Sequence, residues 1–429
     1  MKFLHTADWH LGNQMKNISR IDEQKNFLAF LKEKIDEEKI STLLVSGDIF
    51  DIVSPSNEAK KIYYNFLSSL NNGPCKNVVI TGGNHDSSSL LDASKELLEN
   101  LNIHVIGTIS SLKCEDLVFE LYDENNCVEG ICCAVPYVRE SELRNFLVQE
   151  DSAGIEKKGF AQEAYKKLYD EVLSCAKKIR GERNIPIVAT GHLYTSGLEG
   201  RLSNALSTES TDDGVKVLDV VGNLGNIDSN IFSNEFDYVA LGHIHYTTTV
   251  DKNPKIRYSG SPFILGFDEC NIPRTMLCVE AEKGCEPKVE KIIVPSFYEF
   301  RRIHGSIDEV KTEFEKICSQ SFEKKTFFEV MYENELNRNI QLEFEEIIGN
   351  LNGNAEIISW KTKRKEEKKK AEGFESIDSY EISDLKGEEI FTRLIQIKSK
   401  EEDLDSEECI KEYLPRFMKI MSEEENENS

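Results

Sequence analysis

Short apolar runs alternate with longer amphipathic segments over residues 1–135. The apolar runs lie at 2–7, 42–46, 77–81 and 103–106, and the segments with helical spacing lie at 21–37, 57–70 and 89–100. Uninterrupted apolar runs of this length are typical of strands that are buried on both faces. Because strands and helices alternate, this part of the chain predicts a mainly parallel sheet covered by helices.

The pattern changes in the following part of the chain. Residues 139–180 keep a helical spacing, and short apolar runs then follow one another at 237–241, 246–250, 256–259, 275–280 and 288–294. Short runs without helices between them predict an antiparallel layer. Together with the parallel sheet, they favour an α/β fold over residues 1–304, with two stacked sheets flanked by helices.

A second, smaller unit is predicted over residues 305–360. Apolar runs at 326–331 and 355–360 predict two strands. The segment between them, 337–349, has apolar residues at helical spacing, namely Ile340, Phe344, Ile347 and Ile348. This pattern predicts one helix with a single buried face, and therefore a small α+β module.

Residues 361–380 predict a linker. It begins with a charge run at 361–370 that is mostly basic. Such a run favours a solvated, flexible connection, and contact with DNA is the alternative.

Residues 381–425 predict a helical segment with two amphipathic stretches, at 388–398 and 406–417. Ser406 is a suitable N-cap for the second stretch, whereas Pro415 interrupts its hydrogen bonds. Two isolated helices cannot fully bury their apolar sides against each other. We therefore expect them to dock on a partner protein, with folding back on the main domain as the alternative.

The composition is that of a globular protein. The chain has 429 residues, of which 39% are hydrophobic and 30% charged, so two or three units are expected. It has no apolar stretch of about eighteen residues that would cross a membrane, and Asp8 and His10 argue against a secretory signal. The eleven cysteines include no CxxC pair. We expect reduced, buried thiols in a cytoplasmic protein, with a cysteine metal site as the alternative.

The formal net charge is −25, and the acidic residues are concentrated at 330–350 and beyond residue 400. DNA phosphates repel an acidic surface. If the substrate is a nucleic acid, we expect bound cations or a partner chain to supply the positive charge, and weak DNA affinity of this chain alone.

Five short motifs carry the candidate chemistry. They are Asp8-Trp9-His10, Gly47-Asp48-Ile49-Phe50-Asp51, Gly83-Asn84-His85-Asp86, Gly191-His192 and Gly242-His243-Ile244-His245. Each of them follows an apolar run that predicts a strand. Because ligands collect at the carboxyl ends of strands in open α/β sheets, we expect the five motifs to meet at one shared edge.

The donors in these motifs are imidazoles, carboxylates and one amide, without thiolates. This mixture favours two divalent cations of the Mn²⁺ type, with Mg²⁺, Fe²⁺ and Zn²⁺ as alternatives. Asp48 is the candidate bridging ligand, because a carboxylate has two oxygens. We predict that His85 acts as general acid on a phosphodiester, oriented by Asp51 or Asp86. Asp86 is alternatively an N-cap of the helix that follows.

Two further features leave alternatives open. The polar loop at 195–214 follows His192, and it either grips the substrate or is a surface insert. Lys16 and Arg20 follow the first motif, and they either contact DNA phosphates or lie on the solvated surface.

The five motifs, in this order, resemble those of the calcineurin-like metallophosphoesterases. The chain further resembles the bacterial SbcD nuclease subunits over roughly residues 1–300, at 4–12, 189–193, 240–245, 258–262 and 267–270. The resemblance implies one metal site formed by Asp8, His10, Asp48 and His245, and another formed by Asp48, Asn84, His192 and His243. It also implies that His85 is the catalytic histidine and Asp51 its partner.

The resemblance implies a DNA nuclease that depends on two metals and acts in DNA repair, recombination and replication. Its activities would be 3′→5′ double-strand exonuclease and single-strand or hairpin endonuclease. Residues 305–360 would cap the nuclease domain, and 381–425 would bind an SbcC-type coiled-coil ABC ATPase in a heterotetramer that contains a homodimer of this chain. The alternatives are a small-molecule phosphodiesterase or phosphatase, and a structural subunit of an ATPase complex.

Overall fold

The computed structural model describes residues 1–148 apart from 72 and 111, then 159–198, 227–334 and 351–364 apart from 352, and the single positions 410, 411 and 414. Residues Met1–Lys365 form one compact unit. The architecture below is that of the described residues in this unit.

The first of two six-stranded sheets has the order β14-β13-β1-β4-β5-β6. Its parallel strands are β1 (Lys2–Thr6), β4 (Thr42–Ser46), β5 (Asn77–Thr81) and β6 (Ile103–Ile106), and β13 (Thr275–Glu280) and β14 (Lys288–Ile293) extend it. The four parallel strands are the ones predicted from the apolar runs. β13 pairs antiparallel with both β1 and β14, so the sheet is mixed.

The second sheet has the order β11-β12-β10-β9-β8-β7. Its strands are β7 (Val118–Tyr122), β8 (Val128–Cys133), β9 (Ile187–His192), β10 (Tyr238–Gly242), β11 (Thr248–Val250) and β12 (Asn253–Tyr258). The central strands β8, β9, β10 and β12 run parallel to one another, and the edge strands β7 and β11 are antiparallel.

The predicted antiparallel layer beyond residue 236 is confirmed only in part, because β11 pairs antiparallel with β12 and β13 with β14 but these strands do not form one layer. β10 and β12 are parallel neighbours in the second sheet, whereas β13 and β14 complete the first. The reason is that sheet membership depends on pairing between distant segments. β13 pairs with β1 at the other end of the domain, and the spacing of apolar runs carries no information about that partner.

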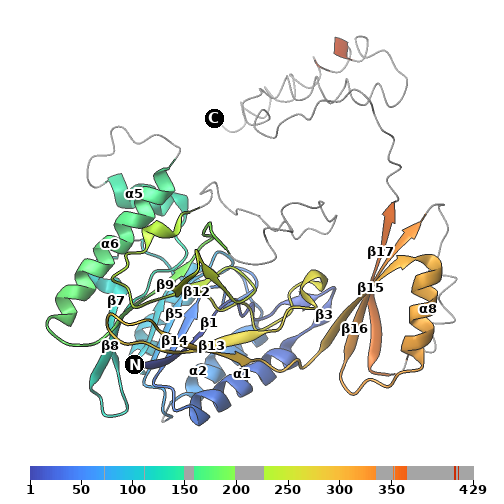
Figure 1. The fold of residues 1–429 in the computed structure, drawn as a ribbon, viewed down its shortest axis with the longest axis horizontal. Helices are drawn as coiled ribbons and strands as arrows, with labels where there is room; N and C mark the ends of the chain where they lie inside the picture. The colour runs from blue at the N-terminus through green and yellow to red at the C-terminus, as the bar shows by residue number, and fades with distance from the viewer. Residues whose placement is uncertain are drawn as a thin grey trace. The chain divides into compact units, whose positions relative to one another are not determined.

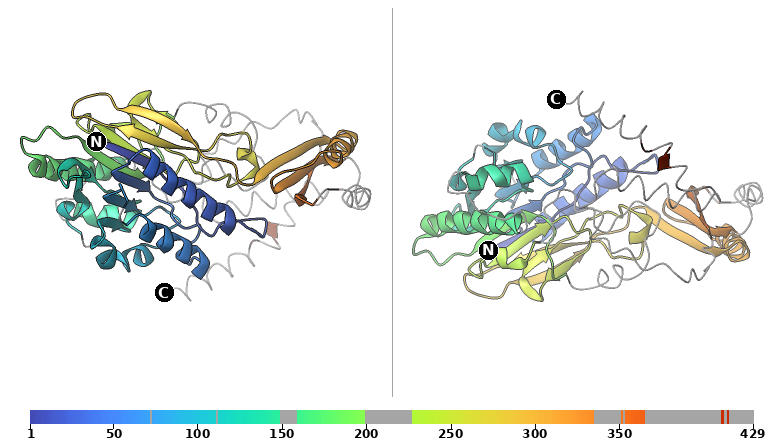
Figure 2. Two further views of the ribbon diagram at one scale, coloured as in Figure 1. Left: turned by 90° about the horizontal axis from the view of Figure 1, so that it is seen from below. Right: turned by 90° about the horizontal axis from the view of Figure 1, so that it is seen from above.

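Helices flank the two sheets on opposite sides (Figure 1). α1 (Ile21–Glu37) and α2 (Asn57–Ser69) lie against the first sheet and share an apolar core with it. α6 (Phe160–Arg180), beside α5 (Glu140–Val148), packs on the second sheet. The views from below and above show the blue helices α1 and α2 and the green helix α6 separated by the sheets (Figure 2). The predicted two-sheet sandwich with flanking helices is confirmed.

The helix predicted at 89–100 is two short helices, α3 (Ser88–Asp92) and α4 (Lys95–Glu99). The break follows Asp92, whose carboxylate accepts a hydrogen bond of 2.8 Å from Gly107 N beyond β6. The remaining short elements are β2 (Gln14–Met15), β3 (Ile18–Ser19), η1 (Cys114–Leu117), η2 (Ser229–Ile231) and η3 (Phe267–Glu269).

The smaller module is a three-stranded parallel sheet with one helix on it (Figure 1). Its elements are β15 (Glu299–Ser306), α8 (Ile307–Cys318), β16 (Thr326–Asn334) and β17 (Ala355–Arg364). Val310 and Phe314 of α8 pack against Phe328 and Val330 of β16. The sheet thus begins before the predicted boundary at 305 and continues past 360 into the predicted linker.

Several predicted features lie outside the described residues. These are the helix at 337–349, most of the loop at 195–214, the linker beyond residue 364, and nearly all of 381–425 with Ser406 and Pro415. Within the described part of the chain, no helix has both the length and the apolar character that a membrane span requires.

The described cysteines are all free thiols. Cys132, Cys133 and Cys278 are buried as predicted, whereas Cys127 and Cys285 are exposed and the others are half-buried. Burial of all the cysteines was therefore too broad a prediction, because an apolar run surrounds only some of them.

Candidate metal centre

The five motifs meet at the carboxyl ends of strands that belong to both sheets. β1, β4 and β5 of the first sheet lead into the Asp8, Asp48 and Asn84 motifs, and β9 and β10 of the second sheet lead into the His192 and His243 motifs. Asp8 N donates to Gly47 O over 3.0 Å, so main-chain hydrogen bonds hold neighbouring motifs together. The structure thus brings the motifs together, but at the edges of two sheets and not of one.

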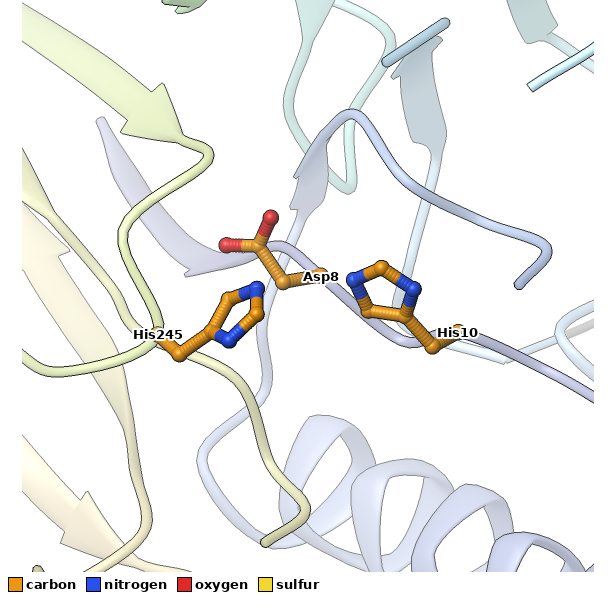
Figure 3. Close-up of side chains that lie close together, drawn as sticks. All are labelled: Asp8, His10 and His245. Atoms are coloured by element: carbon orange, nitrogen blue, oxygen red, sulfur yellow. The ribbon is translucent and has the colours of Figure 1, made fainter. Parts of the chain in front are cut away.

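Asp8, His10 and His245 form the first cluster. Their ligand atoms lie within 4.8 Å of one another, and the three side chains point toward a common centre (Figure 3). Asp48 Oδ2 lies 3.5 Å from His10 Nε2 and adds a fourth donor. Asp8 Oδ2 and His10 Nε2 are buried and make no hydrogen bond within the described residues. Buried polar atoms without a partner are costly, and a bound cation would satisfy both.

Asp48, Asn84, His192 and His243 form the second cluster. Asn84 Oδ1 lies 3.0 Å from His192 Nε2 and 3.0 Å from His243 Nδ1. Asp48 Oδ2 lies 3.3 Å from the same His192 Nε2. His192 Nδ1 donates to the Ser46 carbonyl over 2.9 Å. Because a carbonyl only accepts, this bond holds a proton on Nδ1, so in the neutral ring the lone pair lies on Nε2, toward the cluster.

Asp48 and His243 already have the charge states of metal ligands, whereas His192 does not. Burial opposes ionisation of Asp48, but His192, His10 and His85 hold its pKa well below its usual range. Burial also opposes protonation of His192, yet the Asp48 carboxylate raises the pKa of His192 to about 9. Burial, together with the charge of His192, lowers the pKa of His243 to about 3. Asp48 is therefore ionised and His243 neutral at pH 7, as metal coordination requires, whereas His192 must lose a proton to bind a metal ion.

Four of the candidate ligands have a left-handed backbone conformation. Asp8, His10, Asp48 and His243 have φ values of 54°, 42°, 51° and 95°, in the left-handed region that non-glycine residues rarely adopt. A Cβ on Gly83 would overlap the Asp48 carboxylate. That motif therefore needs glycine because the chain passes directly against a candidate ligand.

His85 is exposed at the rim of the centre. Its Nδ1 donates to the main-chain carbonyl of Asp51 over 2.9 Å. The Asp51 carboxylate instead accepts from Asn13 Nδ2 over 3.0 Å and lies 3.3 Å from His10 Nδ1. Asp51 thus contacts His85 through its main chain, which the sequence did not indicate.

Asp86 has a structural position. Its buried carboxylate accepts hydrogen bonds from Ile49 N, Phe50 N and Gly83 N over 3.0, 2.9 and 2.8 Å. It therefore ties two motif loops together. The alternative that Asp86 caps the next helix is wrong, because Ser87 is the N-cap of α3 and accepts from Leu90 N.

Arg20 neither contacts DNA phosphates from the surface nor lies in solvent, so both predictions for it are wrong. Its side chain is buried, with 1% exposed. It pairs with Glu23 over 2.7 Å, and its guanidinium lies 4.9 Å from the centre of the Phe300 ring in β15. Apolar packing around a charged group cannot be read from the local sequence. Lys16 is exposed, as both alternatives require.

Glu269 is a site residue that the motif analysis missed. Its Oε1 lies 3.1 Å from His245 Nδ1. In the sequence, residues 267–270 were noted only because they resemble the SbcD nuclease subunits. A single carboxylate outside a ligand motif does not by itself predict contact with a metal site. Burial opposes ionisation of Glu269, but the hydrogen bond from His245 and the charges of His245 and Arg274 lower its pKa.

Comparisons with known proteins agree with this geometry. Residues 1–247 match the family model described as calcineurin-like phosphoesterase. The SbcD component of the SbcCD nuclease from Escherichia coli K12 is 27% identical over 404 residues, which cover 94% of each chain. The component of the same name from Rhodobacter capsulatus is 30% identical over 293 residues, 67% of this chain and 68% of that relative. The one from Bacillus subtilis is 28% identical over 300 residues, 69% and 70% of the two chains.

The matched residues 1–247 contain every motif of the two clusters. The chain belongs to the calcineurin-like phosphoesterases and, within them, to the SbcD nuclease subunits, and it is a metal-dependent phosphodiester hydrolase.

Proposed function

We propose that this chain cleaves DNA at a centre of two divalent cations. The observation that supports this most is the position of Asp48, whose Oδ2 faces His10 of one cluster and His192 of the other. A carboxylate shared between two sets of ligands is what a two-metal site requires.

Asp8, His10, Asp48 and His245 would hold one ion, and Asp48, Asn84, His192 and His243 the other. The oxygen and nitrogen donors favour Mn²⁺, which we propose as the metal, over softer ions that prefer thiolates. When bound, two such ions supply Lewis acidity that polarises a phosphate and activates water.

His85 would act as the general acid. The Asp51 carbonyl holds the proton on His85 Nδ1, so the opposite ring nitrogen is the one that exchanges a proton with substrate. The ring is exposed beside buried ligands, which lets it reach the leaving oxygen of a phosphodiester. Asp51 would orient it through the main chain.

We further propose 3′→5′ double-strand exonuclease and single-strand or hairpin endonuclease activity in repair and recombination. The relatives are named as subunits of an SbcCD nuclease, which supports an SbcC-type ATPase as partner in a heterotetramer that contains two copies of this chain. The net charge of −25 supports the same view, since an acidic chain needs a partner or bound cations to hold DNA. We propose that the complex works in the cytoplasm.

The test compares two substrates with Mn²⁺ present. The purified chain is incubated with end-labelled linear or hairpin DNA, and separately with bis-p-nitrophenyl phosphate. His85→Gln is the inactive variant, and His304→Gln, which changes an exposed histidine of β15, is the matched control. Labels at the 3′ and 5′ ends report the direction of degradation.

Cleavage of DNA that is lost in His85→Gln and kept in His304→Gln is the expected result. If the wild-type chain hydrolyses only the small ester, even with the ATPase partner added, DNA is not its substrate and a small-molecule phosphodiesterase is favoured. If His85→Gln cleaves both substrates at the wild-type rate, the role of His85 is wrong.

A further inference from the structure

The carboxylate of Glu269 connects one candidate metal ligand to a rigid part of the fold. Oε1 faces His245 Nδ1 at 3.1 Å. Oε2 accepts from Leu265 N over 3.0 Å and pairs with Arg274 over 3.0 Å. Its side chain is 12% exposed, so solvent does not compete strongly for these contacts.

Arg274 fixes this carboxylate from the other side. Its guanidinium also donates to the main-chain carbonyls of His245 and Glu269, each over 2.9 Å. The residue directly precedes β13, which pairs with β1. The His245 loop, η3 and the strand that leads into Asp8 are therefore held together by one buried guanidinium.

The contact determines which nitrogen of His245 is available to a cation. An ionised carboxylate only accepts hydrogen bonds, so the proton lies on Nδ1 and the lone pair on Nε2. The His245 ring points toward Asp8 and His10 (Figure 3). We propose that Glu269 is a positioning residue that orients His245 and keeps its Nε2 free to bind one metal ion. This inference rests on the proposed two-metal centre.

His245 needs such support more than His10 and His192 do. Its side chain is 32% exposed, whereas those of His10 and His192 are 3% and 0% exposed. Packing therefore immobilises His10 and His192. His192 is also held by a main-chain carbonyl, which no side-chain substitution removes. Loss of Glu269 should weaken the first cluster and leave the second intact, because among the described candidate ligands it is His245 that Glu269 contacts.

The test is a Mn²⁺ titration of the full chain and its variants, followed by calorimetry and by the electron paramagnetic resonance signal of free Mn²⁺. Glu269→Gln removes the negative charge. It also replaces one of the two accepting carboxylate oxygens with an NH2 group, which only donates. Asp237→Asn is the matched control, because Asp237 is a buried carboxylate that accepts from Ile187 N and Gly284 N over 2.9 and 2.7 Å. Unfolding in chelator measures how much each variant destabilises the metal-free protein.

We expect Glu269→Gln to weaken one of two Mn²⁺ sites by about 10- to 100-fold, as loss of a carboxylate behind a histidine ligand typically does. The other site keeps its affinity, and hydrolysis recovers at high Mn²⁺. Asp237→Asn should lower stability and leave both affinities unchanged. Should Glu269→Gln fail to fold, Glu269→Asp keeps the charge beside Arg274, shortens the reach to His245, and is expected to show the same selective loss.

If both sites of a folded Glu269 variant bind as in the wild type while its stability falls like that of Asp237→Asn, Glu269 is only structural. If the wild-type chain itself binds no Mn²⁺, the proposed metal centre fails, and this inference fails with it. The wild-type titration therefore distinguishes the two failures.

Discussion

The two oxygens of Asp48 have different neighbours. Oδ1 accepts from His85 N over 2.9 Å, whereas Oδ2 faces His10 and His192. One residue therefore links the candidate general acid to both candidate metal sites. The role of each residue therefore depends on which of its atoms makes each contact. The following predictions test such contacts one at a time.

Asp51→Asn tests whether the carboxylate or the main chain of Asp51 supports His85. The variant keeps the main-chain carbonyl that holds His85 Nδ1, so His85 remains oriented. We expect His85→Gln to lower kcat by about 10²–10⁴-fold and Asp51→Asn by far less. Steady-state hydrolysis of bis-p-nitrophenyl phosphate at saturating Mn²⁺ measures both. Equal losses would show that the carboxylate matters as much as His85 itself.

The affinity for metal should rise with pH. Burial disfavours protonation of His192, but Asp48 raises its pKa to about 9 in the metal-free protein. A cation must displace that proton below pH 9, so affinity increases by up to about tenfold per pH unit toward that value and then levels. His243, whose pKa is lowered to about 3, releases no proton at pH 7. Calorimetry in buffers with different protonation enthalpies counts the protons released, and a count of zero at pH 7 would contradict this prediction.

Gly83→Ala should impair metal binding. A Cβ there would overlap the Asp48 carboxylate, so Asp48 or the loop must shift. We expect weaker Mn²⁺ binding and a stability loss of about 1–3 kcal/mol, as overpacking usually causes. Gly353→Ala is the control, since a Cβ at Gly353 meets nothing within 4 Å. Titration and urea unfolding measure the two effects, and similar behaviour of the two variants would argue against close packing at Gly83.

At the scale of elements, side chains connect loops that follow different strands. Asp86 connects the Gly47 and Gly83 loops, and Phe267 of η3 contacts Phe300 of β15 with ring centres 5.8 Å apart. η3 thus touches the smaller module through Phe267 and the metal centre through Glu269. The positions of the ligands therefore depend on these few connections as well as on the strands that precede them.

Asp86→Ala should lower the free energy of unfolding more than the loss of a helix N-cap side chain typically does. It leaves three buried main-chain N–H groups without an acceptor, at about 1–3 kcal/mol each. Asp92→Ala is the matched variant, because within the described part of the chain Asp92 accepts from Gly107 N alone. Urea unfolding in chelator compares them without metal. Equal free energies of unfolding would show that the three amides find other partners.

At the scale of the whole molecule, all candidate metal ligands lie in the compact unit that ends at Lys365. The remaining unit, Glu366–Ser429, holds the predicted partner-binding segment. The chemistry and the partner interaction should therefore separate when the chain is divided at this boundary.

A chain that ends at Lys365 should keep the hydrolysis of bis-p-nitrophenyl phosphate, since it retains all the contacts of the metal centre that the described residues make. It should lose co-purification with the SbcC-type ATPase that we propose as the partner of the full chain. Comparison of kcat and of co-purification for the two chains tests both statements. A truncated chain that is folded but inactive, or one that still binds the ATPase, would place the respective function elsewhere.

The sequence was most informative about local features. The strands β1, β4, β5 and β6 lie where apolar runs predicted them, because burial on both faces requires such runs. The seven candidate ligands were predicted as a set, and the structure gathers their side chains at one place. Short motifs after strands are local in sequence, so the chemistry of the donors could be recognised without a fold.

Only the tertiary structure decided which segments meet. β13 belongs to the first sheet and β12 to the second. The buried guanidinium of Arg20 lies over the Phe300 ring. His85 donates to the Asp51 carbonyl, and the Glu269 carboxylate contacts His245. Each of these contacts joins residues that are distant in sequence or uses a main-chain atom that every residue possesses. Composition and periodicity report the environment of a residue, whereas the identity of its partner follows from packing of the whole chain.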